Sequence, residues 1–296
     1  MTGFKRYGCC RCQIAITPQP APTMSNIKFV VCALIAVASM IPPVRAAAQS
    51  DDSDWLRQCR DNNRWNDNRE THCEVREVRV RASGGRVTME GLRNGGVSVT
   101  GWDRDSIVVK TRIRAEARSE SAARAIASQV RTVVNGATIS ATGPQTGDGA
   151  SWSASFVSSI PRRSNLRVET RNGPVSVSGV RGDLDVETRN GPLSLRDLAG
   201  SVRARSSNGP LSISLNGDRW DGAGMDARTT NGPLTISIPE GYSAHLEAST
   251  TNGPLSVGFP ITVSGRIGRN VSADLGSGGA TVRAETTNGP LSIRRR

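Results

Sequence analysis

Histidine and aromatic side chains are scarce in this chain of 296 residues. It has two histidines, His72 and His245, and 4% aromatic residues. The two are 173 positions apart, and no cysteine or acidic cluster matches either one, which disfavours histidine-based catalysis and the common zinc patterns. The net charge of +12 includes five basic residues among the first 49, and the remaining charges are interspersed. Nucleic-acid binding usually needs clustered cations and stacking aromatics. We therefore predict a non-enzyme with no cofactor, no metal and no nucleic-acid partner.

Long apolar runs are also rare, and the clearest one lies near the N-terminus. From Met24 a short polar segment precedes the apolar run Phe29 to Ile41, and small residues follow at 46–48. This is the three-part pattern of a secretory signal peptide, and the run is short for a membrane span. We predict a leader at residues 1–48, with translation starting at Met24. The mature chain is expected to have no transmembrane segment and to be periplasmic, envelope-associated or secreted.

Cysteine is equally sparse after this leader, where only Cys59 and Cys73 remain. An even pair in an exported chain is typical of a disulfide, and closing a loop of this size would stabilise the fold by roughly 3 kcal/mol. The enclosed residues are mostly charged or amide side chains around one tryptophan. We predict a disulfide-stapled polar segment at 49–74.

What the chain does have is an internal repeat. The tripeptide Asn-Gly-Pro occurs six times, at intervals of 18, 18, 23, 21 and 36 residues. Apolar and polar residues alternate on both sides of each copy, and serine or threonine takes the outward position after proline. This period of two is typical of half-buried strands. The predicted corner turns are Asn172, Gly173, Asn190, Gly191, Asn208, Gly209, Asn231, Gly232, Asn252, Gly253, Asn288 and Gly289.

Two all-β architectures fit this repeat. Asn-Gly between alternating runs favours hairpins, but the following proline lacks the N–H that a two-residue turn uses. The alternative is a single-stranded parallel β-solenoid of about 18 residues per coil, right-handed by the crossover preference. Like residues of successive coils would then stack, and the corner asparagines could form an amide ladder. We favour the solenoid and leave the hairpin sandwich open.

The solenoid is predicted at 164–296, as about seven coils. A small α+β cap is predicted at 75–163, with short strands and one helix from Ser119 to Val133. The terminal run Arg294–Arg296 would discourage strand addition at the far end. The sequences following Asn94 and Asn135 look like altered copies of the corner, so the repeat could begin before residue 164. The strands predicted in the cap are Val75–Arg81, Arg86–Glu90, Val97–Thr100, Ser106–Ala115, Ala137–Ala141 and Trp152–Ile160.

The Asn-Gly-Pro units, the passage 216–226 and the passage 239–242 resemble the exported bacterial putative-adhesin family of β-strand repeat proteins, a domain of largely unknown function. The resemblance covers roughly residues 75–296. It implies a β-solenoid at the cell envelope or outside the cell. No catalytic residues are established for that family, so none are transferred.

Three groups of side chains are candidates for chemistry: Asp218, Asp221 and Asp226; Trp220, Tyr242 and Phe259; and Asp183, Asp185 and Glu187. The first group could bind calcium, but its spacing matches neither the EF-hand loop nor the glycine-aspartate calcium repeat, so a solubilising role is favoured. The second consists of isolated aromatics, which more often fill a bend than form a sugar platform. The third alternates on one outward strand face and does not form the facing pair of a glycosidase.

The repeated flat faces favour an adhesin-like interaction module that binds an envelope or cell-surface glycan or protein, because many weak contacts add through avidity. The first alternative is a self-associating structural scaffold of the envelope. A carbohydrate-active enzyme ranks below both.

Overall fold

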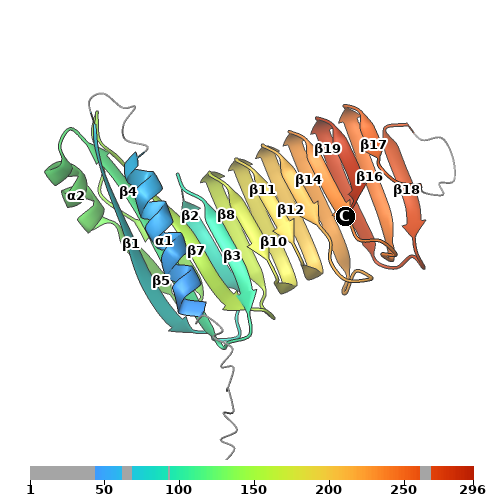
Figure 1. Cartoon of the computed structure of the whole chain (residues 1–296), viewed down its shortest axis with the longest axis horizontal. Coiled ribbons are helices and arrows are strands. Elements are labelled where there is room, and N and C mark those ends of the chain that lie inside the picture. The colour runs from blue at the N-terminus through green and yellow to red at the C-terminus, as the bar shows by residue number, and fades with distance from the viewer. Residues whose placement is uncertain (1–43, 62–68, 93, 261–267) are drawn as a thin grey trace, which may run out of the picture. The chain divides into compact units, whose positions relative to one another are not determined.

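The computed structural model describes residues 44–61, 69–92, 94–260 and 268–296 (Figure 1). Residues 44–296 form one compact unit. The predicted signal peptide up to residue 43 lies outside the described residues. Neither helix of the described chain has the length and apolar character that a bilayer crossing requires.

The described chain is predominantly β. Its helices are α1 (Val44–Asp61) and α2 (Glu120–Gln129). Its strands are β1 (Glu70–Arg81), β2 (Val87–Leu92), β3 (Val97–Trp102), β4 (Ser106–Ala117), β5 (Arg131–Asn135), β6 (Thr138–Thr142), β7 (Ser151–Pro161), β8 (Leu166–Asn172), β9 (Val175–Ser178), β10 (Arg181–Asn190), β11 (Leu193–Arg196), β12 (Ala199–Asn208), β13 (Leu211–Ser214), β14 (Gly224–Asn231), β15 (Leu234–Ile238), β16 (Ala244–Asn252), β17 (Leu255–Val257), β18 (Asn270–Leu275), β19 (Thr281–Asn288) and β20 (Leu291–Arg295).

The strands form two ten-stranded sheets. Sheet A has the order β1-β4-β7-β3-β9-β11-β13-β15-β20-β17. Sheet B has the order β18-β16-β19-β14-β12-β10-β8-β2-β6-β5. Pairing is parallel among the Asn-Gly-Pro strands and antiparallel at β1–β4, β4–β7, β5–β6 and β16–β18. The all-β prediction is therefore confirmed, but the strand orientation is mixed and not parallel throughout.

Each repeat unit consists of one strand of sheet B, an Asn-Gly-Pro corner and a short strand of sheet A. Successive units pair in exact register, so that Leu184 faces Leu166 on one side and Val202 on the other.

The core lies between the two sheets. Alternate residues of each strand point inward and are almost completely buried, among them Leu193, Leu211 and Leu234. They belong to one continuous cluster that extends from β2 to the last unit. A hydroxyl two residues before each asparagine is buried as well, for example Thr188. Its Oγ1 accepts a hydrogen bond from Thr170 Oγ1 at 3.1 Å, which satisfies the polar group inside the core.

The final unit departs from the expected order. β19 pairs in parallel with β14 on one side and with β16 on the other, and β20 lies between β15 and β17. The last unit along the chain is thus inserted between the two units that precede it (Figure 1). Parallel pairing is decided by matching side-chain patterns and not by order along the chain.

Two expectations fail because of this insertion. The 36-residue interval contains the antiparallel strand β18 and no further coil, so residues 164–296 hold six Asn-Gly-Pro units in the described sheets and not seven coils. Arg294 and Arg295 belong to an internal strand. They therefore do not protect the end of the sheet from strand addition.

A similar insertion occurs near the N-terminus. β2 lies between β6 and β8, and β3 lies between β7 and β9. The corner at Asn94 therefore belongs to the repeat, as the sequence indicated. The second suggested copy is wrong, because Asn135 pairs with Thr138 in the antiparallel hairpin of β5 and β6.

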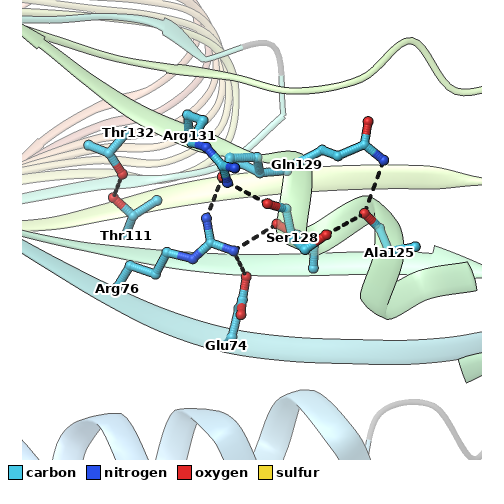
Figure 2. A network of polar contacts seen from close by, with 10 residues as sticks. Glu74, Arg76, Thr111, Ala125, Ser128, Gln129, Arg131 and Thr132 are labelled. Atoms are coloured by element: carbon cyan, nitrogen blue, oxygen red, sulfur yellow. Dashed lines mark hydrogen bonds and ion pairs between the residues drawn. The ribbon is translucent and has the colours of Figure 1, made fainter. Parts of the chain in front are cut away.

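The helix predicted from Ser119 to Val133 is shorter in the structure. Ser119 caps α2 by accepting a hydrogen bond from the Ala122 N–H, and α2 ends at Gln129, where β5 follows. The Arg76 guanidinium donates to the carbonyl oxygens of Ala127 and Val130 and pairs with Glu74 (Figure 2). A cation at the last carbonyl groups stabilises a helix end.

The segment around the predicted disulfide contains helix α1, which the sequence analysis did not predict. Cys59 and Cys73 are bonded, so the disulfide is confirmed. The bond attaches α1 to β1. α1 is also attached to β4, because Asp52 forms ion pairs with Lys110 and Arg112.

Candidate binding face

The outward side of sheet A carries regular rows of hydroxyl groups. The residues four positions after successive asparagines pair directly, so that Ser194 lies beside Ser176 and Ser212, and Ser212 beside Thr235. Neighbouring strands are about 4.8 Å apart, which sets the spacing of these hydroxyls. We call this surface the hydroxyl face; its members are Ser176, Ser178, Ser194, Ser212, Ser214, Thr235, Ser237 and Ser292.

Three arginines border a shallow depression of about 500 Å³ on the hydroxyl face. Arg196 is exposed, and its guanidinium has no hydrogen-bond or ion-pair partner among the described residues. Arg294 donates to Thr235 Oγ1 at 3.5 Å, and Arg296 donates to Ser214 Oγ at 3.4 Å. The depression thus combines neutral hydroxyls, which donate and accept, with cations that only donate.

Sheet B presents a different outward side, in which charges alternate in sign across neighbouring strands. The ladder runs Arg167, Asp185, Arg203, Asp226, Arg283 and Glu247. Arg167 contacts Asp185 at 2.9 Å, and Arg283 contacts Glu247 at 2.6 Å. Opposite charges across strands stabilise a sheet, so this face largely neutralises itself.

The arginines of this charged side are held in the ionised form by their neighbours. The hydrogen bond that Arg167 donates to Glu169, aided by the charge of Asp185, raises the pKa of Arg167. The hydrogen bond that Arg228 donates to Asp226 raises the pKa of Arg228 in the same way. These exposed pairs are weakened by solvent screening and contribute little to stability individually.

The corner asparagines form a continuous amide ladder along one edge. Every Nδ2 except that of Asn94 donates to the Oδ1 of the neighbouring asparagine at 2.8–3.0 Å. The order follows the sheets and not the sequence: Asn94, Asn172, Asn190, Asn208, Asn231, Asn288 and Asn252. The expected amide ladder is therefore present, and it has one direction throughout.

The candidate calcium ligands do not converge. Asp218 pairs with Arg219, Asp221 with Arg181, and Asp226 with Arg228. The pairing with Arg219 lowers the pKa of the exposed Asp218. Within the described ranges, no three His, Cys, Asp or Glu side chains gather as metal ligands.

The outward acids of β10 are also taken up by arginines. Asp183 pairs with Arg86 and Asp185 with Arg167. On β12, Ser201, Arg203 and Arg205 lie opposite Asp183, Asp185 and Glu187. On β8, Arg167 lies opposite Asp185 and Glu169 opposite Glu187, on the same outward side of the sheet. The arrangement has the outward orientation that their alternation predicts.

The aromatics of the repeat region fill space between units. Trp220 is 5% exposed and donates its Nε1–H to the Gly200 carbonyl oxygen at 3.1 Å. Tyr242 is 3% exposed, and burial together with the charge of Asp218 raises its pKa to about 12. Phe259 is half-buried under the Arg295 guanidinium. None of these three rings forms part of an exposed aromatic row.

The placement of three arginines beside the hydroxyl face was not predicted from the sequence. Arg196 is the last residue of β11, and its pairing with Ser214 was visible in the repeat. The position of Arg294 beside the hydroxyl face was not visible in the repeat, because it depends on the insertion of β20 beside β15.

The chain belongs to the Toastrack DUF4097 family, whose model matches residues 61–294. None of the curated proteins matches it. The resemblance to a putative-adhesin family of β-strand repeat proteins is thus confirmed at the level of the family.

Several solved structures are similar to parts of this fold. A putative cell adhesion protein from Clostridium sporogenes is 12% identical, with a TM-score of 0.41, and the match covers 77% of this chain and 100% of that one. A putative adhesin from Bacteroides fragilis is 8% identical, with a TM-score of 0.29 and coverage of 75% and 97%. A putative lipid binding protein from Parabacteroides distasonis is 10% identical, with a TM-score of 0.25 and coverage of 76% and 97%.

Proposed function

We propose that this protein is an exported, non-enzymatic interaction module whose hydroxyl face binds a glycan or protein surface at the cell envelope or outside the cell. The observation that carries the proposal is the regular row of outward hydroxyls on consecutive strands, Ser176 to Ser292, beside the depression with its arginines. Hydroxyls and guanidinium groups together can bind the hydroxyl and acidic groups of a polymer.

Regular repetition suits a polymeric partner. Each hydroxyl contact is weak, but contacts at equal spacing on a rigid support can form together, and their free energies add without further ordering of the protein. The self-neutralising charges of sheet B offer less to a partner, because most are already paired within the sheet. The hydroxyl face is therefore the better candidate of the two outward faces.

Cosedimentation of the full chain with isolated cell envelopes and with peptidoglycan, at low and high salt, tests this function. The informative variant carries Ser194→Glu, Ser212→Glu and Thr235→Glu, three neighbouring outward positions of sheet A. The matched control carries the same three charges on sheet B, as Ser207→Glu, Thr230→Glu and Thr287→Glu. These residues are exposed or half-buried, and each directly precedes one of the paired asparagines of three neighbouring strands.

We expect the unmodified protein to stay bound to the envelopes or peptidoglycan at high salt. The sheet A variant should lose this binding, and the sheet B variant should keep it. Retention that disappears completely in high salt would reduce the interaction to attraction by the basic charge. Equal retention of both variants would exclude the hydroxyl face as the binding surface.

A self-associating scaffold is the second candidate, and the end of the stack favours it. β17 and β18 are the last strands of their sheets in the described chain. Unpaired strand edges are templates for another strand. Light scattering over a concentration series checks this, because growth of the particle mass with concentration is expected for a scaffold and a constant monomer mass for the interaction module.

The same proposal includes the finer organisation of the chain. We retain a leader at 1–48, a stapled segment at 49–74, a cap at 75–163 that contains the repeat corner at Asn94, and a right-handed β-solenoid at 164–296. The disulfide supports export, because such bonds persist in oxidising compartments. N-terminal sequencing of the protein from its natural host tests the leader, since recovery of residues before Met24 would contradict it.

A further inference from the structure

The amide ladder ends at its N-terminal side in a pocket. This pocket has a volume of about 520 Å³ and lies where the loop between β6 and β7 passes the corner at Asn94. The lining residues that can contact a ligand are Asn94, Gln145, Thr146, Ser151, Trp152 and Arg171. Its volume lies within the range of small-molecule sites, about 300–1,000 Å³.

Asn94 has a spare donor because the ladder is directional. Its Oδ1 accepts from Asn172 Nδ2 at 3.0 Å, in the same way as Asn172 accepts from Asn190. Each further Nδ2 donates toward the N-terminal end, but no asparagine precedes Asn94 there, and its Nδ2 has no hydrogen-bond partner among the described residues. A chain of aligned amides polarises its members, which strengthens the terminal donor. The free N–H groups therefore suit an acceptor oxygen of a ligand.

Trp152 supplies apolar surface to the same pocket. Its Nε1–H donates to the Pro144 carbonyl oxygen at 3.0 Å, so the polar edge of the indole is already satisfied within the protein. The ring packs against Gly143, where an added Cβ would lie 2.6 Å from Trp152 Cε2. The ring position is thus fixed by the loop, and the carbon surface that it offers suits the C–H groups of a sugar ring.

Arg171 provides a cation at the same place. It is exposed, lines the pocket and has no ion-pair partner among the described residues. A guanidinium group binds a carboxylate with two parallel hydrogen bonds. From these groups together we infer that the pocket binds one sugar residue that carries a carboxylate, a uronic-acid type of saccharide, with the carboxylate on Arg171 and the ring against Trp152.

This site is separate from the hydroxyl face, which lies on the outward side of sheet A. The two assignments use different residues, so either can fail without the other. Loss of envelope binding in the sheet A variant would leave sugar binding in the pocket unchanged. Loss of sugar binding in the pocket variants would leave the hydroxyl-face test intact.

Ligand-observed NMR titration of the full chain tests the inference. The probes are D-glucuronate and D-galacturonate, with D-glucose and acetate as comparisons. The structure predicts that at least one uronate binds more tightly than glucose and acetate. Arg171→Ala should weaken that uronate by about tenfold, the effect of one lost charge-assisted pair. The matched control is Arg203→Ala, which removes an exposed cation from the outward side of sheet B.

Asn94→Asp is the second variant. It keeps an oxygen that can accept from Asn172 and replaces the spare donor by a carboxylate oxygen, so the ladder contact is retained while the anion is repelled. The affinity for the uronate should fall by the same factor, and the midpoint temperature of thermal unfolding should stay unchanged. Binding of acetate as tight as that of the uronates would show that the pocket binds a carboxylate only, which overturns the sugar assignment. Absence of binding of both uronates, or unaltered binding in both variants, would overturn it entirely.

Discussion

The repeat units from β8 to β15 and the N-terminal part from β1 to β7 both consist of alternating strands, but they are held together differently. In the repeat units, like residues stack on like residues and the corner backbones approach closely. In the N-terminal part, antiparallel strands are joined to two helices by a disulfide, ion pairs and the Arg76 contacts. Stability is therefore spread along the repeat but depends on particular attachments at the N-terminal end.

Close backbone approach makes the corner glycines the most sensitive positions of the repeat. Gly191 has a φ of 145°, and an added Cβ would lie 2.3 Å from the Gly173 carbonyl oxygen. Backbone atoms cannot move aside as a flexible side chain can. The same collision recurs at the next corner, where Gly209 meets the Gly191 carbonyl oxygen at 2.2 Å. The register of the two sheets thus requires glycine at this place in each unit.

The largest expected effect follows from this requirement. Gly191→Ala should lower the free energy of unfolding by about 4 kcal/mol, because it combines an unfavourable backbone conformation with a collision that separates two units. Urea unfolding measures the loss. The control is Gly217→Ala, where φ is 79° but no atom lies within 4 Å of the added Cβ, so that only the backbone cost of about 1 kcal/mol remains. Equal losses in the two variants would show that close approach does not matter.

Removal of the disulfide is expected to have the next largest effect and to be confined to the N-terminal part. The double variant Cys59→Ser and Cys73→Ser should lose about 3 kcal/mol, the loop-closure contribution for this separation. Without the bond, α1 keeps its contacts to β1 and β4, which include the ion pairs of Asp51 and Asp52 and the packing of Trp55 under Arg112. Hydrogen exchange should therefore accelerate in α1 while β10 to β13 stay protected. Uniform acceleration through the repeat would mean that both regions unfold as one unit.

A smaller effect is expected from the amide ladder. Asn208→Asp removes the donor to Asn190 Oδ1 and places a carboxylate oxygen beside that acceptor, at a cost of about 1 kcal/mol. The comparison is Gln129→Glu in α2, which removes an isolated exposed hydrogen bond to the Ala125 carbonyl oxygen. The midpoint temperature of thermal unfolding should fall in the ladder variant and stay nearly constant in the helix variant. The opposite ranking would show that the ladder adds nothing beyond one surface amide.

Much of the repeat region could be predicted from the sequence because its order is local and periodic. The spacing of Asn190 from Asn172 sets the register, and the alternation around Leu193 sets the inward face. The disulfide followed from the count of cysteines. These features depend on neighbouring residues or on exact repetition, which a single sequence displays.

The remaining features depend on contacts that the sequence does not order. β19 pairs equally well with β14 and β16, so its place between them could not be derived from the interval of 36 residues. α1 was missed because its apolar contacts are few and its position depends on distant ion pairs with Lys110 and Arg112. The pocket at Asn94 likewise requires the loop after β6 to meet a corner that lies far away in the sequence.

The smallest effect at neutral pH is expected for Tyr242, which is buried where the spacing between units is longer than 18 residues. Burial raises the pKa of its phenol from 10.0 to about 12, so the folded state favours the neutral form. Its contribution to stability is complete below about pH 10 and is lost as pH rises toward 12, because the unfolded phenol ionises first. Tyr242→Phe should leave stability at pH 7 nearly unchanged and reduce the loss between pH 10 and 12. Unfolding free energies measured across that range check this, and identical slopes for the two proteins would contradict it. The regular 18-residue units contain no buried tyrosine. A smaller decrease of the unfolding free energy with pH in the Tyr242→Phe variant would therefore assign the loss of stability at alkaline pH to the longer interval and not to the regular units.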